Sequence, residues 1–407
     1  MSRALALYPL YRVPRTIPFL RALSKTYPVL LKFFGIILFL INVRSWPLTW
    51  HLRVWRPVFQ IKLRQTLAQL SCIFQSRRIR NAENERFLES LSPVGMNPLD
   101  ITSPYKTWAG PDDCDFNFHL SNSSYAKNLD AARFKTSATF FPALFTCGGF
   151  VALGATHYSF LREIPICAKY EMISNLLCWD NKWIYIVTRF ITRGQNRKSN
   201  LPKLGPSTSN INLQLSNLEL NLPDLGPGSS GLKHFISTEA LNAESQGATL
   251  NCIAISRMCF KFGRITAPPS LVLACEGFTN PLPKSHLLSC DPNCPLSTYS
   301  HANPPPHYKK HVLALRNPDL DNGSLKRLQK FLKGGWRDVP EGERWWEEAL
   351  GGALEERRKK NMELVDGVRS GMDNLREMYF SCFHTGLVWF WVYYLIATYP
   401  SSLKVVL

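Results

Sequence analysis

The first 80 residues contain no aspartate and no glutamate, yet they hold fourteen lysines and arginines interleaved with strongly apolar segments. Over all 407 residues the formal net charge is +18, which suits an anionic partner such as nucleic acid, a membrane surface or a phosphate-bearing ligand. A nucleic-acid binder would need its excess basic charge in the globular part of the chain. Most of that charge lies beside the apolar N-terminal segments, so a membrane surface is favoured and no nucleic-acid partner is expected.

A small-residue cleavage site is also missing after the apolar run from Tyr27 to Val43, which argues against a cleavable signal peptide. The run has a single charge, Lys32, placed where its side chain can reach an interface. It is short for a complete membrane span. The following segment, RSWPLTWHLRVWRPVF, alternates Trp with Arg as at a headgroup boundary. We favour a basic leader over 1–26 and a membrane anchor with an interfacial segment over 27–60, against the alternative of a buried helix.

The cysteines of this chain follow no recurrent spacing. Its 11 cysteines are irregularly spaced, and the closest pair, Cys290 and Cys294, stands in the Pro-rich segment CDPNC without a second pair of the same kind. A structural zinc site needs four ligands at short, recurrent spacings. The pattern therefore indicates packed thiols in a reducing compartment, and we expect neither a metal nor a cofactor.

Hydrophobic periodicity places a globular α+β domain over 98–317, after a linker over 61–97. The segment NSSYAKNLDAARFKTSATFF begins with good N-cap residues and has a helix-like spacing of apolar side chains. The segments FVALGATHYSFL, AKYEMISNLLCW, KWIYIVTRFITR and ATLNCIAISRMCFKF are rich in β-forming residues. These patterns predict a central helix followed by an antiparallel meander.

Three further segments differ in composition from this domain. Residues 194–246 are rich in Ser, Asn, Pro and Gly and predict a disordered insertion within the domain. Residues 318–378 predict charged amphipathic helices. The apolar tail over 379–407 has no Asp, Glu, Lys or Arg up to Leu403. It is long enough for a second membrane segment, and a helix packed on the protein surface is the equal alternative.

Short polar residues gather in DCDFNFHLSNSSY, residues 113–125, where the central helix is expected to begin. Asp115 is either a turn former or a general base, because carboxylates serve in both ways. Asn122 is expected to be an N-cap whatever else it does. His119 is expected either to satisfy a backbone carbonyl or to line a site. The residues alone leave these alternatives open.

A family resemblance rests on this corner. The pattern D-x-D-x-x-G-H-x-x-N leading into a helix stands here as DDCDFNFHLSNSSYAKNLDAARF, followed by THYSFLREIPICAKYE and WDNKWIYIVTRF. It resembles the hot-dog fold acyl-CoA thioesterases, and more narrowly their membrane-anchored branch, thioesterase superfamily member six. The resemblance covers about Pro98 to Asn317 and implies an antiparallel sheet wrapped around the central helix. It also implies a homodimer or higher oligomer, and the membrane is expected to be that of the endoplasmic reticulum. More basic residues lie on the C-terminal side of the apolar run than on its N-terminal side, which favours a hot-dog domain that faces the cytosol.

The resemblance also implies roles for individual residues. It implies that Asp115 is the catalytic base or nucleophile and that Asn122 supplies the amide that polarises the thioester carbonyl. By the same analogy Asn117, Phe118 and His119 contact the acyl-CoA substrate, which is hydrolysed to a free fatty acid and coenzyme A. One departure stands out, because Phe118 occupies the family's glycine position. The alternative is therefore an inactive hot-dog scaffold that binds acyl groups or a protein partner.

Overall fold

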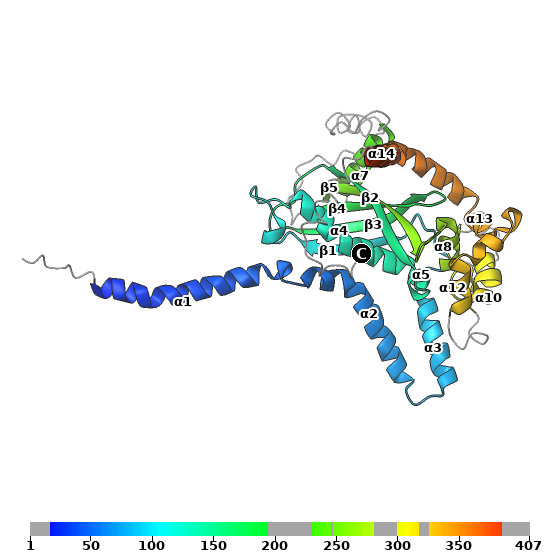
Figure 1. Ribbon diagram of the computed structural model, residues 1–407, viewed down its shortest axis with the longest axis horizontal. Helices are drawn as coiled ribbons and strands as arrows, with labels where there is room; N and C mark the ends of the chain where they lie inside the picture. Colours follow the sequence, from blue (N-terminus) through cyan, green and yellow to red (C-terminus); the bar gives the residue numbers. More distant parts are fainter. Residues whose placement is uncertain (1–16, 194–229, 246, 281–298, 317–324, 385–407) are drawn as a thin grey trace, which may run out of the picture.

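The computed structural model describes residues 17–193, 230–245, 247–280, 299–316 and 325–384 (Figure 1). Its centre is one antiparallel sheet in the order β1-β3-β4-β5-β2, with β6 paired to β5. The strands are β1 (Thr102–Trp108), β2 (Phe150–Phe160), β3 (Lys169–Trp179), β4 (Ile184–Arg193), β5 (Ala248–Phe262) and β6 (Ile265–Ala267). The four long strands lie where the β-forming segments were predicted. Strand β1 was not foreseen, because Pro104 and Lys106 interrupt the apolar alternation of this edge strand.

Helix α4 (Asn122–Phe140) lies on the inner face of the sheet. Its buried side chains Tyr125, Leu129 and Ala132 share a core with side chains of β3, β4 and β5. The ring of Tyr125 lies 5.0 Å from that of Phe190 on β4, centroid to centroid. The antiparallel sheet around a central helix, which is the hot-dog arrangement, is therefore confirmed.

The outer face of the sheet is covered as well. Helices α7 (Ser230–Ser245) and α14 (Ala353–His384) pack there, and Leu232, Ile236 and Val365 are buried against β4 and β5. Because both faces are covered, β4 and β5 are buried almost continuously instead of alternating. The prediction of a disordered insertion over 194–246 is wrong for 230–245, which form α7. The part of that prediction over 194–229 lies outside the described residues.

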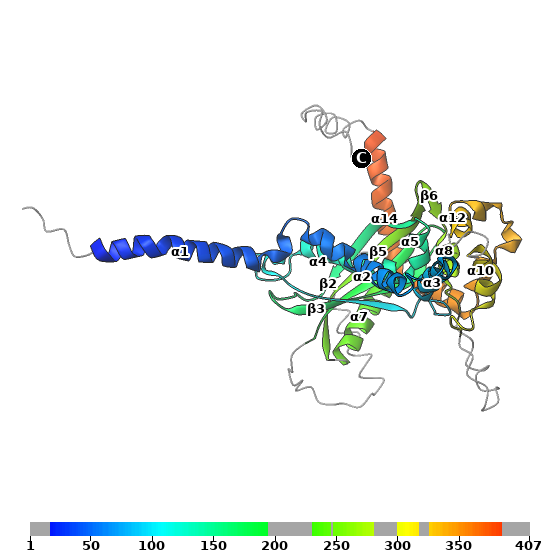
Figure 2. The same ribbon diagram turned by 90° about the horizontal axis from the view of Figure 1, so that it is seen from below.

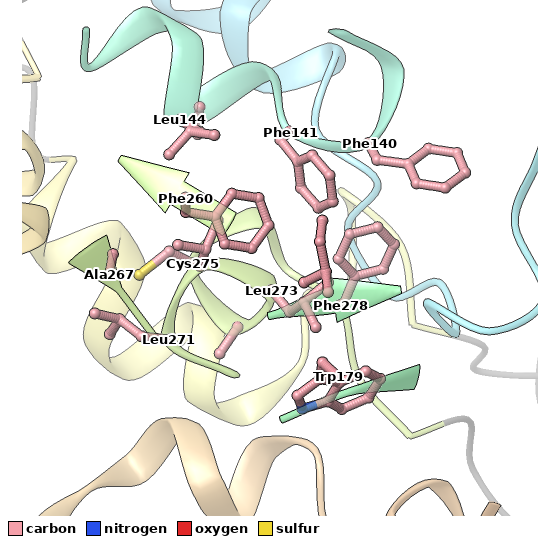
Figure 3. Packing of buried hydrophobic residues seen from close by; sticks show 14 of the residues in the cluster. Phe140, Phe141, Leu144, Trp179, Phe260, Ala267, Leu271, Leu273, Cys275 and Phe278 are labelled. Atoms are coloured by element: carbon pink, nitrogen blue, oxygen red, sulfur yellow. The ribbon is translucent and has the colours of Figure 1, made fainter. Parts of the chain in front are cut away.

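A second hydrophobic core lies at the C-terminal end of α4. Helices α5 (Pro142–Thr146), α8 (Pro269–Glu276), α12 (Lys326–Leu332) and α13 (Trp345–Ala349) enclose it together with the end of β5. Figure 3 shows aromatic rings and aliphatic side chains from α5, β5 and α8 packed together. The rings of Phe141 and Phe260 meet edge to face at 4.8 Å. Nearby, η3 (Tyr308–Val312) and α10 (Leu313–Leu315) form a smaller cluster in which Tyr308 and Val312 pack on Val94.

The N-terminal region is helical almost throughout. Helix α1 (Ile17–Ile41) leads through the short turn η1 (Val43–Ser45) into α2 (Thr49–Ser71) and α3 (Arg77–Ser90). The last two form a hairpin that projects from the domain (Figure 1). The prediction of a linker over 61–97 is therefore wrong for most of its length. Its charged, weakly periodic sequence concealed these helices, on which Leu63, Leu67 and Leu70 are exposed beside the charged residues.

Helix α1 projects away from the domain, as both views show (Figures 1 and 2). Its apolar side chains are exposed on all sides from Tyr27, at 59%, to Ile41, at 44%. The alternative of a buried helix for this segment is thus wrong. Within the described residues, however, no helix has both the length and the apolar character required to cross a bilayer. The expectation of a spanning anchor is not supported there, and the tail after His384 lies outside the described residues.

Candidate active corner

The polar cluster of the sequence forms a closed loop ahead of α4. A β-bridge joins Cys114 to Leu120, and the N–H of Ser121 donates to the carbonyl oxygen of Asp113 at 3.0 Å. Ser121 is the N-cap residue, since its Oγ accepts from the N–H of Ser124 at 3.3 Å. The prediction that Asn122 is the N-cap is therefore wrong by one residue: Asn122 is the first residue of the helix. We call residues 113–122 the active corner.

Asp115 lies exposed within this loop. Its Oδ1 accepts from the N–H of Asn117 at 2.9 Å and from that of His119 at 3.3 Å. The turn-forming interpretation is thus correct, because this carboxylate organises the loop. Both bonds use Oδ1, and in the part of the chain that the structure describes no bond is seen to Oδ2. A structural role for one oxygen leaves the other free to meet a substrate.

The start of α4 supplies hydrogen-bond donors beside the loop. The first N–H groups of a helix have no acceptor within the helix, and here they belong to Asn122 and Ser123. The helix dipole adds partial positive charge at the same place. Asn122 is exposed, so a carbonyl oxygen can approach this helix end. Burial and the neighbouring Asp113 raise the pKa of the Cys114 thiol, which disfavours a thiolate nucleophile at neutral pH.

Phe118 has a left-handed backbone, with φ of +62°. Glycine adopts this conformation without steric cost, whereas a residue with a Cβ does not. The backbone is held there on both sides, because the N–H of Phe118 donates to Asp115 and the N–H of Ile166 donates to Phe118. Its side chain is 66% exposed and that of Phe116 is 90% exposed. Two aromatic rings therefore project from the corner into solvent.

The expected site residues lie in one loop, but they differ in their contacts. His119 Nδ1 lies 3.0 Å from Glu163 Oε2, so its ring contacts a carboxylate instead of a backbone carbonyl. Asn117 is exposed and contributes its backbone N–H to the turn. No cluster of metal-ligating side chains occurs in the described residues. Cys290 and Cys294 lie outside them.

The corner rests on a buried ion cluster that the sequence did not reveal. Asp113 is fully buried and accepts from Arg44 Nε at 3.0 Å and from Lys127 Nζ at 3.1 Å. Arg44 belongs to η1 and also donates to Thr107 and Asn128. Asp113 opens the polar segment 113–125, but the sequence holds no signal that pairs it with a residue far upstream. Because both of its oxygens face cations, Asp113 supports the corner and is not free to react.

Comparison with known proteins identifies relatives of this domain. Residues 109–201 match the family model described as thioesterase-like superfamily. A thioesterase of Purpureocillium lilacinum is 27% identical over 197 residues, covering 42% of this chain and 63% of the relative. A probable thioesterase of Saccharomyces cerevisiae is 38% identical over 94 residues, covering 21% of this chain and 38% of the relative. Protein THEM6 of Xenopus laevis is 34% identical over 83 residues, covering 20% and 40%.

A solved structure was also found to be similar. The probable thioesterase YbaW from Escherichia coli has 8% sequence identity and a TM-score of 0.28, covering 43% of this chain and 95% of that one. The chain spans less than two thirds of the length of each of the three relatives compared by sequence, from Purpureocillium lilacinum, Saccharomyces cerevisiae and Xenopus laevis. The matched region includes the active corner, α4 and the first long strands.

Proposed function

Since residues 109–201 belong to the thioesterase-like superfamily, we propose that this chain hydrolyses a fatty acyl-CoA thioester to the free acid and coenzyme A. The observation that carries the proposal is the active corner, where the exposed carboxylate of Asp115 lies in a loop closed onto the N-terminus of α4. A thioesterase needs a base or nucleophile beside a group that stabilises negative charge on the carbonyl oxygen.

The proposed chemistry uses groups of this chain alone. Asp115 Oδ2 either takes the proton of an attacking water or attacks the carbonyl carbon itself. The carbonyl oxygen gains negative charge, which the N–H groups at the start of α4 stabilise. The carbon–sulfur bond then breaks, and the CoA thiolate leaves and takes up a proton. If Asp115 attacked directly, water hydrolyses the resulting anhydride and restores the carboxylate.

The test is release of free thiol from a panel of acyl-CoA substrates by the full chain and by Asp115→Asn. The amide oxygen of Asn can accept the same two loop N–H groups, so the turn is kept. We expect the rate to fall by about 10²- to 10⁴-fold, as for loss of a positioned general base. Asp338→Asn is the matched control, because Asp338 is exposed in η4 (Gly335–Asp338), outside the active corner.

The alternative of an inactive scaffold is supported by one observation, the phenylalanine at position 118 with its left-handed backbone. If neither the full chain nor Phe118→Gly releases thiol from any acyl-CoA, the scaffold interpretation replaces hydrolysis. If the full chain is active and Asp115→Asn is equally active, the assignment of Asp115 fails while the activity stands.

We also propose that α1 rests in a membrane interface. Apolar side chains exposed on all sides of a helix are unfavourable in water, and those of α1 are exposed from Tyr27 to Ile41 on a helix that projects from the domain (Figures 1 and 2). The proposed membrane is that of the endoplasmic reticulum, and the larger number of basic residues after α1 favours a domain that faces the cytosol. Flotation of the full chain with liposomes tests this, and recovery of the chain in the lipid-free fraction would exclude it.

The proposed assembly is a homodimer through β2. In the described part of the chain β2 pairs with β5 alone, so its other edge offers free N–H and C=O groups. Phe150, Leu153 and Phe160 on this strand are exposed at 46%, 50% and 39%. A second copy would complete the hydrogen bonds and cover these side chains.

A further inference from the structure

A cavity of about 750 Å³ lies between the α2–α3 hairpin and the C-terminal half of α4. Most of its wall comes from the four helices α2, α3, α4 and α5, and Leu91, Phe150 of β2 and Leu325 complete it. The volume falls within the range of roughly 300–1,000 Å³ that is usual for small-molecule sites. We call this space the hairpin cavity.

The hairpin cavity is separate from the active corner. Phe134 lines it, and at about 1.5 Å of rise per residue Phe134 lies about 18 Å along α4 from Asn122. The other α4 residue in the wall is Ala138, farther still from the corner. A ligand in the cavity therefore does not touch the groups proposed for thioester hydrolysis.

The wall of the cavity changes character along the hairpin. Near the domain it is made of apolar side chains, among them Trp55 on α2, Leu88 on α3, and Phe134 and Phe145 on α4 and α5. Trp55 remains 49% exposed, so the cavity is open on its side. An apolar, half-open space of this kind suits an aliphatic chain.

Toward the hairpin tip the lining is polar. Lys62 Nζ donates to Gln65 Oε1 at 3.1 Å, and Gln65 Nε2 donates to Asn84 Oδ1 at 2.7 Å. An ammonium group has three N–H donors, and among the described residues Lys62 shows no carboxylate partner. Glu85 also lines this end, and burial raises the pKa of its carboxyl. The polar end can therefore receive an anionic group.

We propose that the hairpin cavity binds a free long-chain fatty acid, with its aliphatic chain along Trp55, Phe134 and Phe145 and its carboxylate at Lys62. Along α2 the lining extends from Trp55 to Gln65, about 15 Å of helix, so the cavity is elongated as a single extended chain requires. A phospholipid with two chains and a large headgroup is a poorer match, because Lys62 is the one cationic side chain among the described residues of the lining. This inference holds whether or not the chain hydrolyses thioesters.

The test uses the full chain purified in an amphipathic polymer and a hexadecanoic acid that carries a photoreactive diazirine on its chain. After irradiation, peptides are mapped by mass spectrometry. We expect label on the α2, α3 and α4–α5 peptides that line the cavity. Unlabelled hexadecanoic acid should compete better than hexadecanol, which has the same chain without a carboxylate. The variant Asp115→Asn should be labelled to the same extent, which separates this inference from the proposed activity.

Two variants address the two ends of the ligand. Ala138→Phe places a ring in the apolar end and should reduce labelling of these peptides at least fivefold. Lys62→Met should raise the concentration of hexadecanoic acid needed for half-saturation about two- to fivefold, the scale of an exposed ion pair. It should also remove the preference for the acid over hexadecanol. Arg64→Met is the control on the same helix, because Arg64 does not line the cavity. Absence of label from these peptides in the wild type, or an unchanged preference for the acid in Lys62→Met, would overturn the proposal.

Discussion

Replacing Phe118 by glycine tests the conformation of the active corner. Phe118 holds φ of +62°, and hydrogen bonds on both sides of the residue fix its backbone. A left-handed conformation costs a residue with a Cβ about 1–2 kcal/mol. The variant Phe118→Gly removes this cost, and it loses little burial because the ring is 66% exposed.

The magnitude follows from two opposing effects. Relief of the backbone cost adds about 1–2 kcal/mol to the free energy of unfolding, whereas the greater freedom of glycine in the unfolded chain removes about 0.5–1 kcal/mol. The expected net gain is therefore about 0.5–1 kcal/mol. Phe116→Gly is the matched control, because Phe116 is 90% exposed and its φ is not positive. That variant should lose about 0.5–1 kcal/mol, so the two variants should differ by about 1–2 kcal/mol.

The assay is chemical denaturation of both variants under one set of conditions, followed by tryptophan fluorescence. Phe118→Ala is a useful third variant, because alanine keeps a Cβ and hence most of the backbone cost. It should be less stable than Phe118→Gly, whereas alanine is the more stabilising residue at ordinary positions. Equal stability of Phe118→Gly and Phe116→Gly would refute the argument that position 118 is strained.

Three further predictions concern other parts of the molecule. Asp113→Ala leaves Arg44 buried without its anion and should cost about 3–5 kcal/mol of unfolding free energy by chemical denaturation; a loss below about 1 kcal/mol would show that the ion cluster does not support the corner. Burial raises the pKa of Glu276 from 4.5 in the unfolded chain to about 7, so its stabilising contribution is complete below about pH 4.5 and is lost as the pH rises through 7. The melting temperature should therefore fall from pH 5 to pH 8 more steeply in the wild type than in Glu276→Gln, and parallel pH profiles would contradict this. Leu153→Lys should dissociate the proposed dimer in light scattering, because it places a charge on the exposed edge strand β2; an unchanged mass would exclude that edge as the interface.

The long strands and the central helix could be predicted because their pattern is local. Strands β2 to β5 are rich in β-branched and aromatic residues, and α4 begins directly after short polar residues. Helix α7 was missed because a segment rich in Ser, Gly and Pro precedes it. Leu232 and Ile236 of this helix are buried because they pack on the sheet, and the local sequence does not encode that contact.

The candidate site was predictable in position but not in its supports. The sequence placed Asp115, Asn122 and their neighbours at one corner, and they do lie in one closed loop. The pairing of Asp113 with Arg44 joins residues 69 positions apart, which no local pattern encodes. The hairpin cavity likewise depends on α2 and α3 folding back against α4, whereas the sequence had suggested an interfacial segment up to residue 60 and a linker over 61–97.

The covering of the outer sheet face by α7 and α14 limits how copies of this chain can assemble. Leu232, Ile236 and Val365 already occupy that face, so stacking of two sheets back to back would require these helices to leave. Among contacts made by the sheet itself, pairing at a strand edge remains available. Pairing of β2 with β2 of a second copy is a twofold contact that uses the same edge on both partners. Two copies close such a contact, so an assembly built on this contact alone is a dimer.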